Sequence, residues 1–212
     1  MSRKGGELVR VYVIIFFLLF GAIAALMVSG MFQELDNQII LSFENIRLPF
    51  LNDVMLTLTD FGISALLVPI MLIFSVVLFM YKRYHSIMLL FLLYIAEKTV
   101  NHELKGLFAR ERPAFDHLVN ETYYSFPSGH SMNAATIYPF IAYLFIEMVP
   151  WLKKRQKAVY MVTGCYVLMI GISRMYIGVH YVTDVAGGFA IGLALFLICK
   201  KIDEKLSVIR QK

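Results

Sequence analysis

Residues 173–184 read Ser-Arg-Met-Tyr-Ile-Gly-Val-His-Tyr-Val-Thr-Asp, a polar stretch between two long apolar runs. It carries Arg174, His180 and Asp184 in a region where charge facing hydrocarbon would be costly. If the chain is helical from His180 onward, His180 and Asp184 lie on one face within reach of each other. A carboxylate beside an imidazole fixes its tautomer, and an arginine fork suits phosphate. The stretch indicates either a phosphoryl-transfer site or an ion pair at the membrane edge with a satisfied histidine.

The composition is that of a membrane protein. Of the 212 residues, 59% are hydrophobic, above the roughly 45–50% of soluble domains. The net charge is +5, but the basic residues form short clusters between apolar runs. The membrane explains such clusters better than nucleic acid does, so we expect no nucleic-acid partner. Cys165 and Cys199 fall inside apolar runs, and we expect both to be small core residues without a disulfide.

We expect an all-α, polytopic membrane protein with six transmembrane helices in one bundle. A bilayer needs about 20 apolar residues per helix, and the candidate spans are residues 11–30, 61–81, 86–104, 132–149, 158–172 and 183–198. No repeat or soluble domain is apparent, so residues 1–212 form one domain. Glu97, Lys98 and His102 interrupt the third span and must face protein or water. Gly188 and Gly192 would let the sixth helix pack closely.

Lysine and arginine in the short loops predict the orientation. They cluster before the first span and after the second, fourth and sixth, so both termini should be cytoplasmic, with Trp151 at that interface. We read the basic start as part of a retained first helix rather than a cleaved signal peptide. The expected location is the plasma membrane. The opposite side carries most acids but also Lys105, Arg110, Arg112 and Arg174, and an anionic ligand would explain these basic residues.

The loop at residues 32–60 mixes apolar and acidic side chains. It is either a short interfacial segment of one or two amphipathic helices between the first and second spans, or a plain connector. Its place beside the outer ends of the bundle would suit a lid or a substrate entrance.

A second polar motif runs from Lys105 to Pro113. Lys105 and Arg112 share a face if the segment stays helical, and Pro113 then ends the helix. Two adjacent cations repel unless an anion lies between them. The alternative is a pair of snorkelling side chains at an interface.

A third motif, Ser125-Phe-Pro-Ser-Gly-His-Ser131, precedes the fourth span. Pro127 suits a first helical turn, and Ser128 and Gly129 would leave free backbone N–H groups at the positive end of a helix, which is a ready anion site. His130 would then point toward the bound anion. Taken alone, the motif is also compatible with an ordinary helix cap and a partly buried histidine.

With six spans, all three motifs emerge on one side of the bundle. Together they supply three cations, a backbone nest, two histidines and a carboxylate, which fits phosphoryl transfer. His180 and Asp184 could instead bind a metal, but a convincing third ligand is missing. We therefore expect no metal and no cofactor.

These motifs resemble those of the type-2 phosphatidic acid phosphatase family, which are membrane lipid phosphatases. That family carries Lys-x6-Arg-Pro, then Pro-Ser-Gly-His, then Ser-Arg-x5-His-x3-Asp. The same order and spacing stand here at Lys105–Pro113, Pro127–His130 and Ser173–Asp184. The short length and six spans look most like bacterial phosphatidylglycerophosphatase type B and undecaprenyl-diphosphate phosphatase members.

The resemblance implies a role for each matched residue. His180 would attack phosphorus and carry a phosphohistidine, oriented by Asp184, and His130 would protonate the leaving group and later activate water. Phosphate would be held by Lys105, Arg112, Ser128, Gly129 and Arg174. Arg110 lies outside the matched pattern, and we interpret it as a snorkelling side chain.

The resemblance also implies a membrane lipid phosphate as substrate, reached within the bilayer at the extracytoplasmic face. We expect hydrolysis of a lipid phosphomonoester, with phosphatidylglycerophosphate giving phosphatidylglycerol as the first choice. Undecaprenyl diphosphate hydrolysis, phosphatidic acid hydrolysis, lipid phosphotransfer and lipid binding without chemistry remain alternatives. No obligate protein partner is evident.

Overall fold

The computed structural model describes residues 3–210, and all regular secondary structure in that range is α-helical. The helices are α1 (Arg3–Val28), α2 (Gln33–Asn45), α3 (Pro49–Asp60), α4 (Ser64–Met80), α5 (Tyr84–Phe108), α6 (Gly129–Met148), α7 (Pro150–Lys154), α8 (Gln156–Tyr176) and α9 (Val182–Arg210). The predicted all-α class is confirmed. Each predicted span falls largely within one long helix.

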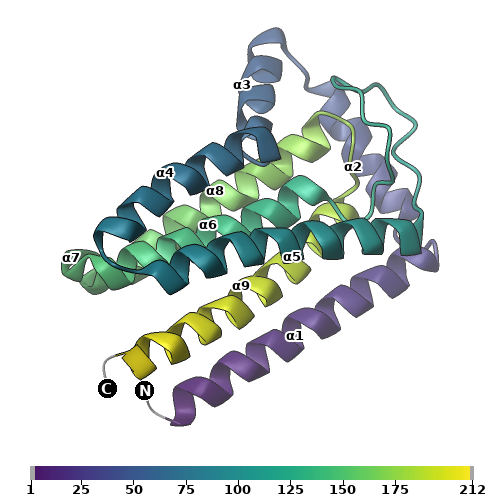
Figure 1. Cartoon of the computed structure of the whole chain (residues 1–212). Coiled ribbons are helices and arrows are strands. Elements are labelled where there is room, and N and C mark those ends of the chain that lie inside the picture. The colour runs from purple at the N-terminus through teal and green to yellow at the C-terminus, as the bar shows by residue number, and fades with distance from the viewer. Residues whose placement is uncertain (1–2, 211–212) are drawn as a thin grey trace.

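Helix α6 lies at the centre of the bundle and is buried along most of its length. It packs against α9, α8 and α5, and α1 runs along α9 (Figure 1). A Cβ on Gly188 would lie 2.7 Å from the Ser128 carbonyl oxygen, and one on Gly192 would lie 2.8 Å from the Met132 carbonyl oxygen. Real Cβ atoms do not approach backbone so closely, so the prediction that these glycines allow close packing of α9 is confirmed.

Length and hydropathy identify fewer spans than the six predicted. Within residues 3–210, the helices that qualify are Gly6–Val28, Gln156–Tyr176 and Val182–Ser207, with α3 and α4 as a fourth if this pair, bent by 52°, is one span. Residues 61–63, at the start of the second predicted span, form the turn between α3 and α4. Helix α5 carries polar residues that face inward: Glu97 is fully buried, and Lys98 and His102 line a cavity. The prediction that they face protein or water is confirmed.

Residues 32–60 form the two helices α2 and α3, so the alternative of a plain connector is wrong. Both pack against α8, at the end of the bundle away from the start of α1 and the end of α9 (Figure 1). Arg47, between them, donates from Nε and Nη2 to the Tyr176 carbonyl oxygen at 3.1 and 3.0 Å. It also pairs with Asp116 at 3.2 Å. These contacts fix α2 and α3 against the loops that carry the motifs.

The cysteine prediction was half right. Cys199 is buried, but Cys165 is exposed on α8. A helix that is apolar on all sides does not reveal which of its faces packs inward, and Cys165 lies on the outer face. Trp151 is also exposed and stacks with Arg155, whose guanidinium carbon is 4.5 Å from the ring centroid.

Candidate active site

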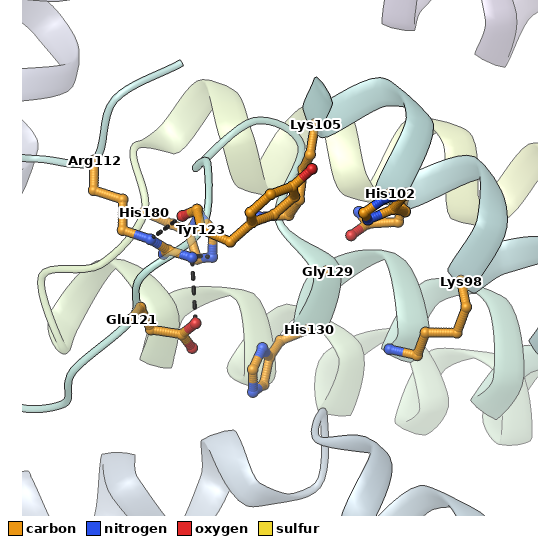
Figure 2. A pocket seen from close by; sticks show the side chains of 10 residues that line it. Lys98, His102, Lys105, Arg112, Glu121, Tyr123, Gly129, His130 and His180 are labelled. Atoms are coloured by element: carbon orange, nitrogen blue, oxygen red, sulfur yellow. Dashed lines mark hydrogen bonds and ion pairs between the residues drawn. The ribbon is translucent and has the colours of Figure 1, made fainter. Parts of the chain in front are cut away.

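The three motifs meet at one cavity of about 350 Å³ beside α5, the start of α6 and the loop before α9 (Figure 2). Its lining residues are Lys98, Asn101, His102, Lys105, Arg112, Glu121, Tyr123, Gly129, His130 and His180. Each motif contributes to this lining. The prediction that the motifs converge is confirmed.

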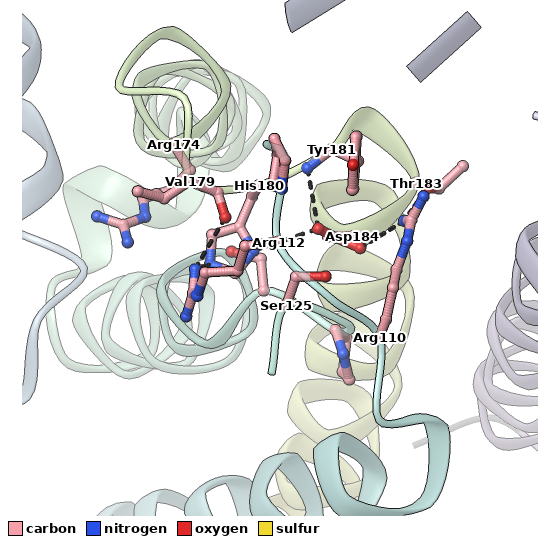
Figure 3. A network of polar contacts seen from close by, with 12 residues as sticks. Arg110, Arg112, Ser125, Arg174, Val179, His180, Tyr181, Thr183 and Asp184 are labelled. Carbon is pink, nitrogen blue, oxygen red and sulfur yellow. Dashed lines mark hydrogen bonds and ion pairs between the residues drawn. The ribbon is translucent and has the colours of Figure 1, made fainter. Parts of the chain in front are cut away.

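His180 lies on the loop between α8 and α9, with polar groups at both ring nitrogens (Figure 3). Its Nδ1 is 3.3 Å from Asp184 Oδ2, and its Nε2 is 3.3 Å from Arg112 Nη1. A guanidinium only donates hydrogen bonds, so Nε2 is the acceptor and Nδ1 carries the proton toward Asp184. His180 precedes α9 rather than belonging to it, and Asp184 still reaches it from the first turn.

The surroundings keep the His180 ring neutral. Burial lowers the pKa of His180 well below its ordinary value, and the charges of Arg174, Arg112 and Lys105 lower it further. The direction follows because both burial and neighbouring cations disfavour the imidazolium. At neutral pH, Nε2 is therefore unprotonated, and its lone pair faces Arg112 Nη1.

Lys105 and Arg112 line the same cavity, but they do not share a helical face as predicted. Helix α5 ends at Phe108, and Ala109 follows in the left-handed region at φ 44°. The helix therefore stops before Pro113, and Arg112 belongs to a loop. Its guanidinium donates to the carbonyl oxygens of Tyr123 at 2.7 Å and Val179 at 2.8 Å. These bonds hold Arg112 beside His180, whereas Lys105 donates to the Tyr124 carbonyl oxygen.

The start of α6 differs in two details from the predicted anion nest. Ser128 is the N-cap, so Pro127 precedes the helix instead of occupying its first turn. The Ser128 N–H donates to the Asp184 carbonyl oxygen at 3.0 Å and is not free. Gly129 lines the cavity, and a Cβ there would lie 3.1 Å from Asn101 Oδ1. Glycine therefore provides the room for this close approach.

Arg174 is buried near the end of α8 and is not among the residues that line the cavity. Its Nη1 donates to Thr59 Oγ1 at 2.8 Å, and its Nη2 donates to Glu121 Oε1 at 2.7 Å. The other carboxylate oxygen of Glu121 is 3.3 Å from Arg112 Nη2. Glu121 thus bridges two of the three predicted phosphate-binding cations.

Arg110 is not a snorkelling side chain, so that interpretation was wrong. Its side chain is 9% exposed, and its Nη1 lies 2.7 Å from Asp184 Oδ1 and 2.7 Å from Thr183 Oγ1. Its Nη2 lies 2.8 Å from Asp36 Oδ2, on α2. The guanidinium also stacks over Tyr181, 4.0 Å from the ring centroid. Arg110 joins the His180–Asp184 pair to α2.

Across residues 3–210, no group of three or more His, Cys, Asp or Glu side chains is arranged to hold a metal ion. A metal-free reaction remains a prediction.

The family model of the PAP2 superfamily matches residues 86–207 of the chain. The chain belongs to the PAP2 superfamily. The matched segment contains all three motifs. The PAP2 membership confirms the resemblance seen in those motifs.

Individual PAP2 proteins resemble the chain over nearly its whole length. Phosphatidylglycerophosphatase B of Bacillus subtilis (strain 168) is 43% identical over 196 residues, which cover 92% of this chain and 97% of the relative. A crystal structure of a transmembrane PAP2 type phosphatidylglycerolphosphate phosphatase from B. subtilis superposes with a TM-score of 0.88 at 42% identity, covering 92% and 96% of the two chains. Aquifex aeolicus LpxE gives a TM-score of 0.61 at 26% identity, covering 81% and 95%.

Three charged residues of the site are not among the residues that the PAP2 motifs specify. Asp36 belongs to α2, before the matched segment. Arg110 occupies an unspecified position inside the first motif, and Glu121 lies between the first and second motifs. Arg110 was visible as a basic residue on the predicted outer side, but its partners come from distant parts of the chain. Glu121 belongs to no sequence motif, and the acidic composition of the predicted outer loops was the one signal that pointed to it.

Proposed function

We propose that the chain is an integral membrane phosphatase that hydrolyses phosphatidylglycerophosphate to phosphatidylglycerol and inorganic phosphate through a phosphohistidine. The support for phosphatase chemistry is PAP2 membership, and the support for the substrate is the whole-length likeness to phosphatidylglycerophosphatase B. The observation that carries the mechanism is the His180 ring, whose Nε2 is an acceptor beside Arg112 while Nδ1 faces Asp184.

In the first step, the Nε2 lone pair of His180 attacks phosphorus, and the bond from phosphorus to the glycerol oxygen breaks. His130 gives its proton to the departing alkoxide. Asp184 stabilises the positive charge that develops on His180. In the second step, His130 takes a proton from water, whose oxygen attacks phosphorus as the bond to Nε2 breaks. Splitting one displacement into two is the advantage of covalent catalysis.

Lys105, Arg112 and Arg174 would neutralise the phosphoryl oxygens, with Ser128 and the Gly129 N–H completing the phosphate site. Such preorganised charge is expected to be the largest contribution to phosphoryl transfer. In this scheme, the protein cations provide the neutralisation for which other phosphatases use metal ions.

We further propose that six helices span the plasma membrane and that the site opens at the extracytoplasmic face. The six helices would be α1, α4, α5, α6, α8 and α9, with α2 and α3 at the interface. The distribution of lysine and arginine supports this orientation. The lipid would enter the site from within the bilayer.

The test is phosphate release by the purified protein across phosphatidylglycerophosphate, phosphatidic acid and undecaprenyl diphosphate. We expect the highest kcat/KM on phosphatidylglycerophosphate. A preference for undecaprenyl diphosphate would overturn the substrate assignment but keep the mechanism. Transfer of the phosphoryl group to an added lipid alcohol in place of water would make the protein a phosphotransferase.

The nucleophile is tested by His180→Ala, which should abolish turnover while phosphate still binds. His130→Ala should lower the rate by about 10²–10⁴-fold, and by less for substrates with good leaving groups. A Glu111→Gln variant, changed at an exposed loop residue, is the matched control. Hydrolysis that persists in His180→Ala would remove the phosphohistidine from the proposal.

A further inference from the structure

Glu121 holds the position on two guanidinium groups that a phosphate would need. Its Oε1 is 2.7 Å from Arg174 Nη2, and its Oε2 is 3.3 Å from Arg112 Nη2. The side chains of Arg112 and Arg174 are 10% and 2% exposed, whereas that of Glu121 is 30% exposed, so the two pairs are shielded from water on the arginine side. Two neighbouring guanidinium groups repel unless an anion lies between them. In this structure, that anion is the Glu121 carboxylate.

Glu121, which binds Arg174, lines the cavity, whereas Arg174 does not. Arg112 lies next to the acceptor nitrogen of His180, so a phosphoryl group on Nε2 would have its oxygens beside Arg112 (Figure 2). For that group to take the Nη2 donors of both arginines, the Glu121 carboxylate has to move away from them. Phosphate and Glu121 therefore compete for the same donors.

A second cavity shows where a displaced carboxylate or a departing phosphate can go. It measures about 440 Å³ and is lined by Arg110, Glu111, Arg112, Glu121, Thr122, Tyr123 and Tyr124. Arg112, Glu121 and Tyr123 line both cavities. The ion pair of Arg112 with Glu121 thus belongs to the wall that the two cavities share.

We propose that Glu121 is a positioning residue for product release. It neutralises Arg112 and Arg174 in the resting enzyme, moves aside when the substrate phosphate binds, and returns to displace inorganic phosphate into the second cavity. This inference rests on the proposed phosphatase function. No bond is made or broken in this exchange, because one anion replaces another on the same two guanidinium groups.

The proposal predicts tighter phosphate binding when the competing charge is removed. Glu121→Gln keeps an oxygen that accepts hydrogen bonds from the arginines but has no charge. The dissociation constant of inorganic phosphate should fall by about tenfold, since like charges at one site disfavour each other. Because the change strengthens the binding of substrate and product alike, KM should fall. If phosphate release limits turnover, kcat should fall with it.

The experiment measures the dissociation constant of inorganic phosphate by calorimetry or thermal stabilisation on the purified, full-length protein. Glu121→Ala, which removes the charge and the hydrogen bonds, should act in the same direction. Glu121→Asp, which retains the charge, should stay near the wild-type value. The control is Glu103→Gln, because Glu103 is exposed on α5, lines neither cavity and enters none of the ion pairs found within residues 3–210. It should match the wild type.

A phosphate dissociation constant that rises or stays unchanged in both Glu121→Gln and Glu121→Ala would overturn the proposal, since Glu121 would then merely support the arginines. A dissociation constant that falls equally in Glu103→Gln would also overturn it, because the effect would then be one of general negative charge near the site. If the proposed function is wrong, the activity assay shows it, because the wild-type protein then releases no phosphate from lipid. The binding measurement needs no turnover, so the two failures are distinct.

Discussion

Four side chains form a chain of contacts from α2 to the cavity: Asp36, Arg110, Asp184 and His180. The three contacts between them measure 2.8, 2.7 and 3.3 Å. Asp36 and Asp184 are almost completely buried, so neither carboxylate has water to replace a lost partner. Breaking a buried ion pair by removing one member is far more damaging than replacing the whole pair. Arg110 therefore supports the carboxylate that orients the proposed nucleophile.

We expect Arg110→Gln to lower both stability and activity. Leaving Asp36 and Asp184 without their shared cation costs about 3–5 kcal/mol, measurable as a lower thermal midpoint in detergent. Asp36→Asn in the same chain should restore part of that loss, because it removes one of the two unpaired charges. Strictly additive effects in this double-mutant cycle would show that the contact carries no coupling.

The pKa of His180 provides a second check on the same network. Burial is the main cause of its lowered pKa, and Arg112 adds to it. Removing that cation in Arg112→Gln should raise the pKa, so His180 becomes protonated at a higher pH than in the wild type. Histidine NMR titration of the phosphate-free protein measures this shift, with Lys154→Gln, a change at an exposed residue of α7, as control. A His180 pKa that falls or stays constant would contradict the electrostatic account.

The helices bring the motifs together chiefly through the contact of α6 with α9. The N-cap of α6 donates its N–H to the carbonyl oxygen of Asp184 in the first turn of α9, which fixes the two helix starts side by side. Farther along, Thr136 donates to Met132 and lies 3.3 Å from the Gly192 carbonyl oxygen. A closely packed helix pair therefore positions His130 relative to His180.

Glycine at position 192 should be necessary for this packing. A Cβ there would meet the Met132 carbonyl oxygen at 2.8 Å and the Ala135 Cβ at 2.9 Å. Overpacking of this kind typically costs about 1–3 kcal/mol, so Gly192→Ala should lower the thermal midpoint and reduce activity. Gly164→Ala on α8 is the matched control, since no atom lies within 4 Å of the added carbon. Equal effects at the two positions would contradict the role given to close packing.

Helix positions could be predicted from the sequence better than helix ends. Apolar runs located each long helix, because burial in a bilayer requires apolar residues over about 20 positions. They placed the start of the last helix at residue 183, one position from its observed start at Val182, but did not reveal that α5 stops at Phe108. Beyond that end, Arg112 is held by long-range hydrogen bonds such as the one to the Val179 carbonyl oxygen. The predicted convergence of the motif residues did not depend on these helix ends, because loops as well as helical faces make their contacts.

The molecule as a whole has one polar centre at each end. The cavity lies at the end near α2 and α3. At the other end, Asp203 is fully buried and accepts hydrogen bonds from Ser86 at 2.6 Å and Tyr143 at 3.0 Å. These bonds join α5, α6 and α9, and both centres are buried within the same bundle. The orientation of the bundle in the membrane then decides which compartment the cavity faces.

Cysteine labelling tests that orientation. In a Cys165→Ser, Cys199→Ser background, Ala114→Cys should react with an impermeant reagent added to intact cells, because residue 114 is exposed and lies two positions after Arg112, which lines the cavity. Lys154→Cys, at the end of α7, should react only after the cells are opened. The reverse pattern would place the cavity in the cytosol and remove the extracytoplasmic assignment.

The partners of the site charges could not be predicted from the sequence. Spacing identified Lys105, Arg112, His130, Arg174, His180 and Asp184, because each lies in a short motif. Asp36 is 74 positions from Arg110 along the chain and Thr59 is 115 from Arg174. Contacts of that range follow from how α2 and α3 fold back over the bundle, which no local pattern expresses.

Because Asp36 belongs to α2, residues 86–207 do not contain all the partners of their own buried charges. A chimera that grafted this segment onto the amino-terminal half of another superfamily member would bury Arg110 opposite a foreign helix. Unless that helix also carried an acidic residue facing Arg110, the Arg110 guanidinium would have Asp184 as its only counter-ion. No second carboxylate would then share its charge. Exchange of substrate preference between members therefore requires that α2 move together with the segment it neutralises.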